Sequence, residues 1–154
     1  MGNRFGLKYT DNQGSEQTPV IMHRAPLGSH ERFIGFLIEH FGGAFPAWLS
    51  PVQVTIIPIA ERHSTYAHEV ADQLLAANIR IELKSEAESM QKKIRNAEMQ
   101  KIPYILVVGD REEHAKAVNI RIRGQKDQQT LKIDQFIAKI STEISSRSVS
   151  SSLV

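Results

Sequence analysis

Arg32 is the first feature of this sequence whose residue type could do chemistry. It follows Gly28 in the stretch "PVIMHRAPLGSHERFIGFLIEH" and stands directly before an apolar run typical of a helix. A guanidinium keeps its charge at any working pH and offers a rigid fork of donors, so Arg32 could bind a triphosphate oxygen. Gly28 has no side chain and would let a ligand approach the backbone closely. From spacing alone, the alternative is an ordinary solvated arginine in a first helical turn.

The six histidines are the second feature, and their spacing does not predict a complete metal site. No HExxH motif occurs, and His63 and His68 are five residues apart, which puts them on different sides of a helix. The sequence has no cysteine, so any metal would need His, Asp or Glu ligands. His23 could be one ligand of a site that is completed elsewhere, or a surface histidine with hydrogen-bond partners.

The third feature is the alternating stretch "AVNIRIR" at residues 117–123. Its apolar side chains would face the core: Val118, Ile120 and Ile122. Because side chains alternate along a strand, Asn119, Arg121 and Arg123 must then share the opposite face. Such a face, close to the polar segment 111–113, can hydrogen-bond unpaired RNA bases and their phosphates. The alternative is a solvated sheet edge guarded by charge.

The composition is that of an ordinary globular protein. A length of 154 residues fits one to one and a half domains with a core of their own. The formal net charge of +2 does not by itself establish nucleic-acid binding, and the lack of cysteine excludes disulfides and thiolate chemistry. The longest apolar runs are far shorter than the roughly 20 residues that cross a bilayer, and no signal peptide is recognisable. We therefore expect a soluble, cytoplasmic protein without a membrane partner.

Residues 1–51 predict a hairpin, a helix and a boundary. "RFGLKYT" and "TPVIMHRA" alternate loosely around the polar "DNQGSEQ", which is typical of two paired strands. Residues 31–41 place Phe33, Phe36 and Leu37 at helical spacing. The stretch "GGAFPAWLSP" contains two glycines and two prolines, which end a helix and mark a domain boundary.

Residues 52–147 predict a regular α/β domain of three layers, because strands and helices alternate with short joints. The expected strands are 52–59, 78–83, 103–109, 117–123 and 129–133, the last two paired across the turn "GQKDQ". The expected helices are 64–77, capped by Ser64, then 86–101, and a last one capped by Asp134.

Helical spacing also predicts which side chains face the core. The inward positions are Ala67, Val70, Ala71, Leu74 and Leu75, then Ala87, Met90, Ile94 and Ala97, and finally Phe136, Ile137, Ile140 and Ile144. The outward basic positions are Lys92, Lys93, Arg95 and Lys101. The serine-rich residues 148–154 are too polar to pack, and we expect them to form a disordered tail.

Three stretches resemble threonyl-tRNA synthetases, a family of class II aminoacyl-tRNA synthetases. "HRAPLGSHERFIGFLIEH" resembles that family's motif 3, and "AFPAWLSPVQV" resembles its junction into the anticodon-binding domain. "KKIRNAEMQKIPYILVVGDREE" resembles the middle of that domain. The resemblance implies a remnant of the catalytic domain at 1–45, followed at 46–147 by a three-layer anticodon-binding domain with a mixed central sheet flanked by helices. It runs from about Arg4 to Arg147.

The resemblance also implies roles for residues of the first part. Arg32 matches the motif 3 arginine, the catalytic residue that contacts the ATP γ-phosphate. Ser29 matches a residue that lines the adenylate pocket, and His23 matches one of three ligands of the active-site zinc. The other motifs and zinc ligands are not in this chain. We therefore expect that the chain alone holds zinc and Mg-ATP poorly and does not aminoacylate tRNA.

In the second part, Glu112 and Arg121 match positions that read anticodon bases, with Arg111 alongside. The resemblance thus implies the C-terminal part of a threonine-tRNA ligase that binds the anticodon of tRNA-Thr, from a parent that is a homodimer. Outward charges at 92, 93 and 95 would add phosphate contacts.

One segment departs from the family. Ala87, Ser89 and Gln91 stand where the family commonly has an asparagine, a lysine and a glycine that help hold the anticodon loop. The alternative function is therefore a non-catalytic accessory protein, with an anticodon-binding-like domain kept for RNA or protein interaction.

Overall fold

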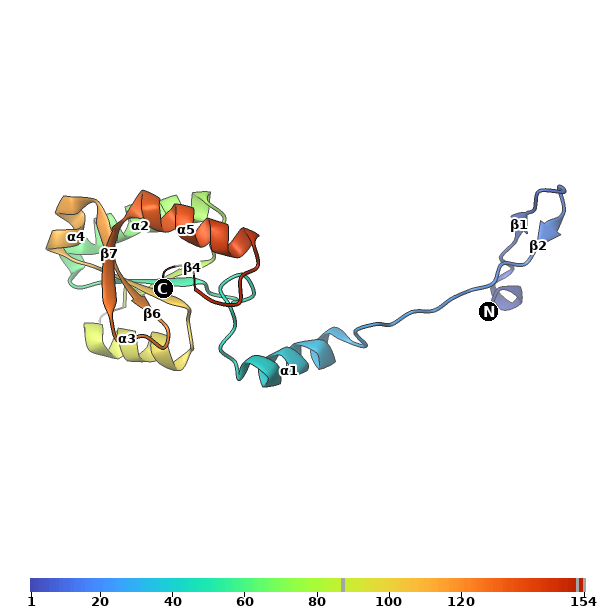
Figure 1. The fold of residues 1–154 in the computed structure, drawn as a ribbon, viewed down its shortest axis with the longest axis horizontal. Helices are drawn as coiled ribbons and strands as arrows, with labels where there is room; N and C mark the ends of the chain where they lie inside the picture. The colour runs from blue at the N-terminus through green and yellow to red at the C-terminus, as the bar shows by residue number, and fades with distance from the viewer. Residues whose placement is uncertain (87, 152, 154) are drawn as a thin grey trace. The chain divides into compact units, whose positions relative to one another are not determined.

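The computed structural model describes residues 1–86, 88–151 and 153. The chain divides into two compact units, Met1–Leu37 and Ile38–Val154, both drawn in Figure 1. The helix α1, His30–Phe41, contains the boundary between them. A transmembrane helix is not found among the described residues, because none of their helices is both long and apolar enough.

The first unit contains a short hairpin. After a 3-10 turn, Asn3–Phe5, the strands β1, Tyr9–Thr10, and β2, Glu16–Gln17, pair antiparallel. The Asp11 carboxylate fixes the turn between them by accepting the backbone N–H groups of Gln13 and Ser15, each at 2.9 Å.

The predicted hairpin is therefore confirmed around its turn, but the second strand predicted at 18–25 is wrong. Residues 18–25 carry no strand, and Val20 and Met22 are 93% and 79% exposed. Alternating apolar residues form a strand only where a sheet face covers them, and a hairpin of two strands offers little such cover.

The helix predicted at 31–41 is confirmed as α1. Gly28 takes a left-handed backbone conformation, with φ of +66°, just before the helix begins. The Ser29 hydroxyl accepts the Arg32 backbone N–H at 3.3 Å and so caps the first turn.

The second unit is built on one mixed sheet of five strands in the order β4-β3-β5-β6-β7. β3, Val54–Pro58, pairs in parallel with β4, Ile81–Leu83, and with β5, Tyr104–Val108. β6, Ala117–Ile122, and β7, Gln128–Lys132, extend the sheet antiparallel. The predicted α/β fold with a mixed sheet is confirmed.

Helices cover the two faces of this sheet unequally. α2, Ser64–Ala76, and α5, Ile133–Ser145, pack on one face, and α3, Met90–Met99, lies on the other (Figure 1). Two shorter turns connect the layers, the 3-10 turn Glu61–His63 and α4, Asp110–Ala115. β3 and β5 are buried at every position because both of their faces are covered, as their continuous apolar sequences predict.

The smaller core, under α3, defines an open part of the sheet. It consists of Ile57 on β3, Ile105 and Val107 on β5, and residues of α3 and the loop after it: Ile94, Ala97 and Ile102. No residue of β6 or β7 belongs to this cluster. On this face the two antiparallel strands therefore present polar side chains instead of core residues.

Two predicted side-chain directions are wrong. Leu75 was expected to face inward and is 53% exposed, because it lies one position past the buried stripe that ends at Leu74. Lys93 was expected to face outward and is buried, with its ammonium group donating to the Lys84 carbonyl at 2.9 Å. A long aliphatic stem can cover a core while the charged end finds a backbone oxygen.

The predicted helix caps also need correction. Ser64 and Asp134 lie inside the first turns of their helices, and the N-cap positions are His63 and Lys132. α3 begins at Met90 rather than at residue 86, because the Ser89 hydroxyl caps it by accepting the Lys92 N–H at 3.4 Å. Ala87, predicted to face inward, lies outside the described residues.

Part of the C-terminal segment packs against the domain, so the disordered tail predicted at 148–154 is wrong for Ser151 and Leu153, whereas Val149 is 73% exposed. Leu153 is only 3% exposed and belongs to the larger core. The Tyr104 hydroxyl donates to the buried Glu143 carboxylate and also contacts the Ser151 hydroxyl, both at 2.6 Å. Burial raises the pKa of the Tyr104 hydroxyl above its ordinary value. A buried hydroxyl needs such partners, which explains why polar serines can pack here.

Candidate nucleic-acid interface

The open part of the sheet contains a hollow of about 220 Å³, here called the sheet hollow. Its apolar lining consists of Ile59, Met90, Ile94 and Val107, and its polar lining consists of Glu112, Asn119, Arg121 and Gln128. An apolar floor with a few polar groups around it is typical of ligand sites. The structure thus brings together Glu112 and Arg121, which the sequence placed on separate elements.

Strand pairing positions the polar groups on β6 and β7. Val118 and Ile120 on β6 are fully buried in the larger core, which confirms the predicted alternation. Asn119 and Arg121 therefore point to the other face, where Arg121 pairs in register with Gln128. The sequence alone did not single out Gln128, because it lies at the end of the predicted turn.

Two buried polar atoms of this hollow have no hydrogen-bond partner within the described part of the chain. They are Asn119 Oδ1, an acceptor, and Arg121 Nε, a donor. Leaving a buried polar group unpaired costs about 1–3 kcal/mol, so such atoms are uncommon unless a ligand or water completes them. The sheet hollow is therefore lined by two side chains that each carry a buried polar atom whose bonding capacity is unused within the described residues.

Glu112 is held at the edge of the hollow by the start of α4. Its Oε2 accepts the backbone N–H of Gly109 at 3.0 Å, and a carboxylate retains further acceptor capacity beyond that one bond. A side chain at position 109 would begin 2.5 Å from the Ile59 Cδ1 atom, so only glycine fits there without a shift. The end of β5 and the loop after β3 are joined beside the hollow by the Ile59 N–H, which donates to the Val108 carbonyl at 2.9 Å.

A buried histidine anchors the same helix. His63 is 1% exposed, and its Nδ1 accepts the Ala60 N–H at 3.2 Å. The ring proton is therefore assigned to Nε2, which donates to Asp110 Oδ1 at 3.0 Å. Arg62 adds two hydrogen bonds to the Asp110 carboxylate, at 2.7 and 3.2 Å. This cluster fixes the first residue of α4, two positions before Glu112.

The cluster also explains the acidity of Asp110. The hydrogen bonds from Arg62, and after them the bond from His63, hold the pKa of Asp110 well below its ordinary value of 3.8. The sequence interpretation missed this cluster. The signal that could have found it is position, since residues after adjacent parallel strands meet at the same edge of a sheet.

Two predicted RNA contacts, Arg123 and Lys93, lie differently from the expectation. Arg123 was placed on the face of Asn119 and Arg121, but its guanidinium donates to the carbonyls of Lys101, Ala44 and Phe45 at 2.6, 3.1 and 2.8 Å. Burial lowers the pKa of Arg123 from its ordinary value. Arg111 is exposed on α4 directly before Glu112, outside the lining of the sheet hollow, and stays a predicted RNA contact. Lys93 is buried, as described above.

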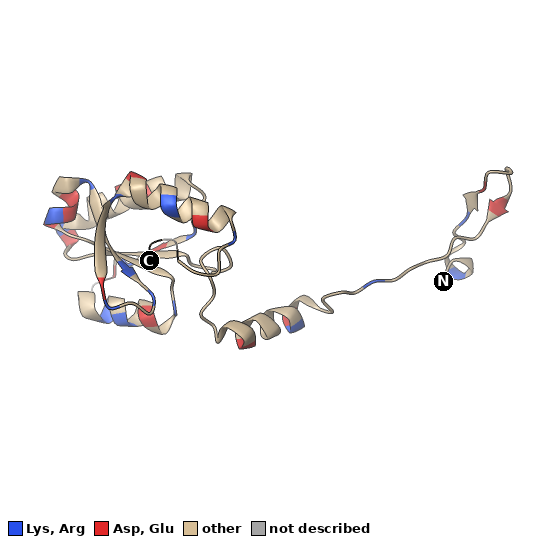
Figure 2. Ribbon diagram, in the orientation of Figure 1, with Lys and Arg blue, Asp and Glu red and all other residues tan. Residues whose placement is uncertain are grey.

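The remaining basic positions of α3 are exposed. Figure 2 shows the basic positions of α3 in blue, with an acidic position in red on the same helix. Lys92 pairs with Glu88 at 2.7 Å, and Arg95 is exposed. At the departure from the family pattern, Ser89 caps the helix and Gln91 is exposed, whereas Ala87 lies outside the described residues.

The predicted catalytic residues lie in the first unit. Arg32 is exposed on α1, Ser29 caps that helix, and His23 is exposed in the segment before it. Within residues 1–86, 88–151 and 153, no three His, Cys, Asp or Glu side chains are close enough to hold a metal ion. The described residues therefore do not make a zinc site around His23.

Comparison with known proteins gives a consistent result. Residues 53–143 match the family model described as the anticodon binding domain. The chain is 50% identical over 145 residues to a threonine–tRNA ligase of Acidobacterium capsulatum, covering 94% of this chain and 21% of the relative. It is 51% identical over 134 residues to one of Thermus thermophilus, covering 87% and 20%. The chain thus spans about a fifth of the length of these curated relatives.

Solved structures show the same fold. The RNA binding domain of threonyl-tRNA synthetase from Cryptosporidium parvum superposes with a TM-score of 0.78 at 36% identity, covering 99% of this chain and 38% of that one. A prolyl-tRNA synthetase from the same organism, in complex with L-proline and AMP, gives 0.70 at 21% identity, covering 94% and 31%. The second likeness, at that identity, indicates the fold alone.

Proposed function

The chain belongs to the anticodon binding domain family, and from this premise we propose that it binds the anticodon loop of tRNA-Thr as the C-terminal part of a threonine–tRNA ligase. The sheet hollow is the proposed binding site. The residues that carry the proposal are Glu112 and Arg121, with Asn119 and Gln128 beside them.

One observation supports the proposal above all others. An acceptor, Glu112, and a donor, Arg121, border the same apolar hollow, and it also contains the unpaired Nε of Arg121 and the unpaired Oδ1 of Asn119. An unpaired nucleobase has two flat apolar faces and an edge of donors and acceptors. Duplex RNA does not offer such an edge, so the hollow favours a single-stranded loop.

In the proposed mode, a base enters with one face against Ile94 and Val107. Its donors meet the Glu112 carboxylate, and its acceptors meet the Arg121 guanidinium. The bond from Gly109 and the cluster at Asp110 keep Glu112 in place, so little ordering is required on binding. Lys92 and Arg95 would add salt-dependent contacts to phosphates.

The first unit would serve the catalytic domain of the complete ligase, which would be a homodimer. We propose that Arg32 contacts the ATP γ-phosphate there and that Ser29 lines the adenylate pocket. Support comes from the match of this segment to the ligases, which extends over 94% of the chain. For His23, a zinc site would require ligands from outside the described residues, and we derive no step through that metal.

A binding titration tests the proposal. The chain is titrated at fixed salt with the anticodon stem-loop of tRNA-Thr and with a loop whose anticodon bases are changed. We expect tighter binding of the unchanged loop by about tenfold or more, since one well-paired base edge discriminates by about 1–3 kcal/mol. Equal affinity for both loops would reject anticodon recognition.

The accessory-protein alternative is favoured by one observation, the helix cap at Ser89 in a position where the family commonly has a lysine. It predicts RNA or protein binding without preference for this anticodon. The same titration therefore separates the two proposals.

A further inference from the structure

The segment between α1 and β3, residues 42–53, is held by side chains of the same unit, and it is here called the junction. Arg123 donates to the junction carbonyls of Ala44 and Phe45 at 3.1 and 2.8 Å. Its other terminal nitrogen donates to the Lys101 carbonyl at 2.6 Å, so one guanidinium ties the junction to the loop after α3. A guanidinium suits this task, because it is planar and directs several donors to fixed positions. These three bonds are here called the clamp.

The clamp lies where the chain leaves α1. Gly42 and Gly43 take left-handed backbone conformations, with φ of +56° and +75°, which end the helix. The backbone N–H groups of residues 42–44 donate to carbonyls of the last turns of α1 at 2.9–3.2 Å. Ala44 therefore bonds to α1 through its N–H and to Arg123 through its carbonyl, so the clamp holds the end of the helix.

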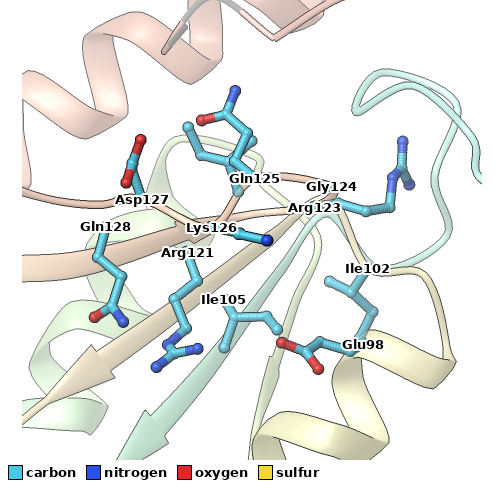
Figure 3. Close-up of a pocket in the computed structure, with 11 residues that line it drawn as sticks. Glu98, Ile102, Ile105, Arg121, Arg123, Gly124, Gln125, Lys126, Asp127 and Gln128 are labelled. Carbon is cyan, nitrogen blue, oxygen red and sulfur yellow. The ribbon is translucent and has the colours of Figure 1, made fainter.

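Arg123 also directly follows the strand that carries the proposed base contact. Arg121 lies two residues before it, and both line one hollow of about 230 Å³. Figure 3 shows their two guanidinium groups extending in opposite directions from the same stretch of chain. A ligand that restrains Arg121 therefore also restrains the end of β6, from which Arg123 reaches the junction.

We propose that Arg123 is a positioning residue that couples the sheet hollow to the end of α1. Binding of the anticodon loop at Arg121 keeps the clamp closed, and the closed clamp favours binding of the loop. The two effects must be equal in size, since linkage makes each a measure of the same coupling. This inference rests on the proposed anticodon binding, because the loop is the ligand that acts on the clamp.

The coupling links recognition to the part of the chain that the proposed function assigns to catalysis. A closed clamp orders the chain that leads back into α1, whereas an open clamp leaves the junction free to move. Loop binding would therefore be felt at the end of α1 without any contact between the loop and that helix.

Amide hydrogen exchange tests the coupling in the full chain. The amides of Gly42, Gly43 and Ala44 are hydrogen-bonded to α1, so their exchange reports how often this end of the helix opens. Exchange is recorded with and without the anticodon stem-loop of tRNA-Thr. We expect the loop to slow the exchange of these amides by about fivefold or more.

Two variants of Arg123 and one control extend the test. R123A removes the clamp, and R123K keeps the charge but lacks the planar fork of donors. R80A is the matched control, because the Arg80 guanidinium holds the same junction at the carbonyls of Trp48 and Ser50, at 3.0 and 2.7 Å. Arg80 lies before β4 and does not line the sheet hollow. Urea denaturation first establishes that each variant is folded.

We expect R123A to speed the exchange of the three amides in the free chain and to abolish the effect of the loop on them. It should also bind the loop more weakly, by the same factor of about fivefold that the loop produces in exchange. R123K should behave like R123A. R80A should keep both the effect of the loop on exchange and the affinity for the loop.

The outcomes separate the two proposals. If the loop binds with preference for its anticodon but leaves the exchange of the three amides unchanged, the coupling is wrong and the proposed function stands. The same conclusion follows if R123K binds the loop as tightly as the unchanged chain, or if R80A weakens binding as much as R123A. If the unchanged chain does not distinguish the tRNA-Thr loop from a loop with a changed anticodon, both the proposed function and this inference fall.

Discussion

The two halves of the central sheet differ in how their faces are covered. β3 and β5 lie under helices on both sides and are buried at every position, whereas β6 and β7 are covered only by the helices of the larger core. The first half is apolar except for Thr55, and the second alternates. Buried polar atoms without a partner among the described residues occur in both halves, Thr55 Oγ1 on β3 and Asn119 Oδ1 and Arg121 Nε on β6, but those on β6 belong to side chains that line the sheet hollow. The covered half therefore supplies stability, and the open half presents the polar side chains of the hollow.

The largest effect on stability should come from a large-to-small substitution in the core of the covered half. Leu106 on β5 is fully buried in the larger core, so L106A should lower the free energy of unfolding by about 2–5 kcal/mol. Urea denaturation measures this loss. A loss below about 1 kcal/mol would contradict the view that this half carries the stability.

Removing positive charge from α3 should have a smaller effect, and on binding rather than on folding. Replacing Lys92 and Arg95 together by alanine should lower the salt dependence of loop binding by about one to two phosphate contacts. The measurement is the slope of log affinity against log salt concentration. An unchanged affinity and slope would show that neither side chain meets a phosphate. K93A should instead destabilise the fold, because Lys93 is buried.

The unpaired groups of the open half allow a sharper comparison. Replacing Asn119 by valine removes the buried Oδ1 that lacks a partner among the described residues. Since that atom contributes no bond to the fold, N119V should leave the free energy of unfolding unchanged or raise it by about 1 kcal/mol, while it weakens loop binding. Urea denaturation of this variant measures its stability, and titration with the anticodon stem-loop measures its binding. A large loss of stability would mean that Asn119 serves the fold.

Acid should weaken the cluster of Arg62, His63 and Asp110, which holds the start of α4. The pKa of Asp110 is lower in the folded chain than its ordinary 3.8, so its contribution to stability is present above pH 3.8 and is lost as the pH falls through the lowered pKa. We expect D110N to be less stable than the unchanged chain at neutral pH. The difference should shrink in denaturation curves recorded from pH 5 down to pH 2. If the difference in stability between D110N and the unchanged chain stayed constant across that range, the charge of the Asp110 carboxylate would not be its cause.

The covered half could be predicted from the sequence more fully than the open half. Continuous apolar runs gave β3 and β5, and the period of two placed Arg121 on the face opposite to Ile120. Lys93 and Leu153 could not be placed this way, because their burial depends on a backbone carbonyl and a core that only the folded chain brings near. Local pattern describes one element at a time and does not say what lies against it.

Only part of the candidate site could be predicted, because local pattern does not say which elements lie next to one another. Alternation supported Arg121, and the resemblance to ligases supplied Glu112. That the two border one hollow depends on the approach of β5 to the loop after β3, where the Ile59 N–H donates to the Val108 carbonyl. Gln128 and the unpaired atoms of Asn119 and Arg121 could be recognised only in three dimensions.

The affinity of the tRNA-Thr anticodon stem-loop for the R121A variant tests the central claim most directly. R24A is the matched control, because it removes the same charge from an exposed position in the first unit. We predict that R121A binds the loop at least about tenfold more weakly while its free energy of unfolding stays within about 1 kcal/mol of the unchanged chain, and that R24A binds normally. Equal affinities of R121A and R24A for the loop would contradict the claim that the open half of the sheet reads the anticodon.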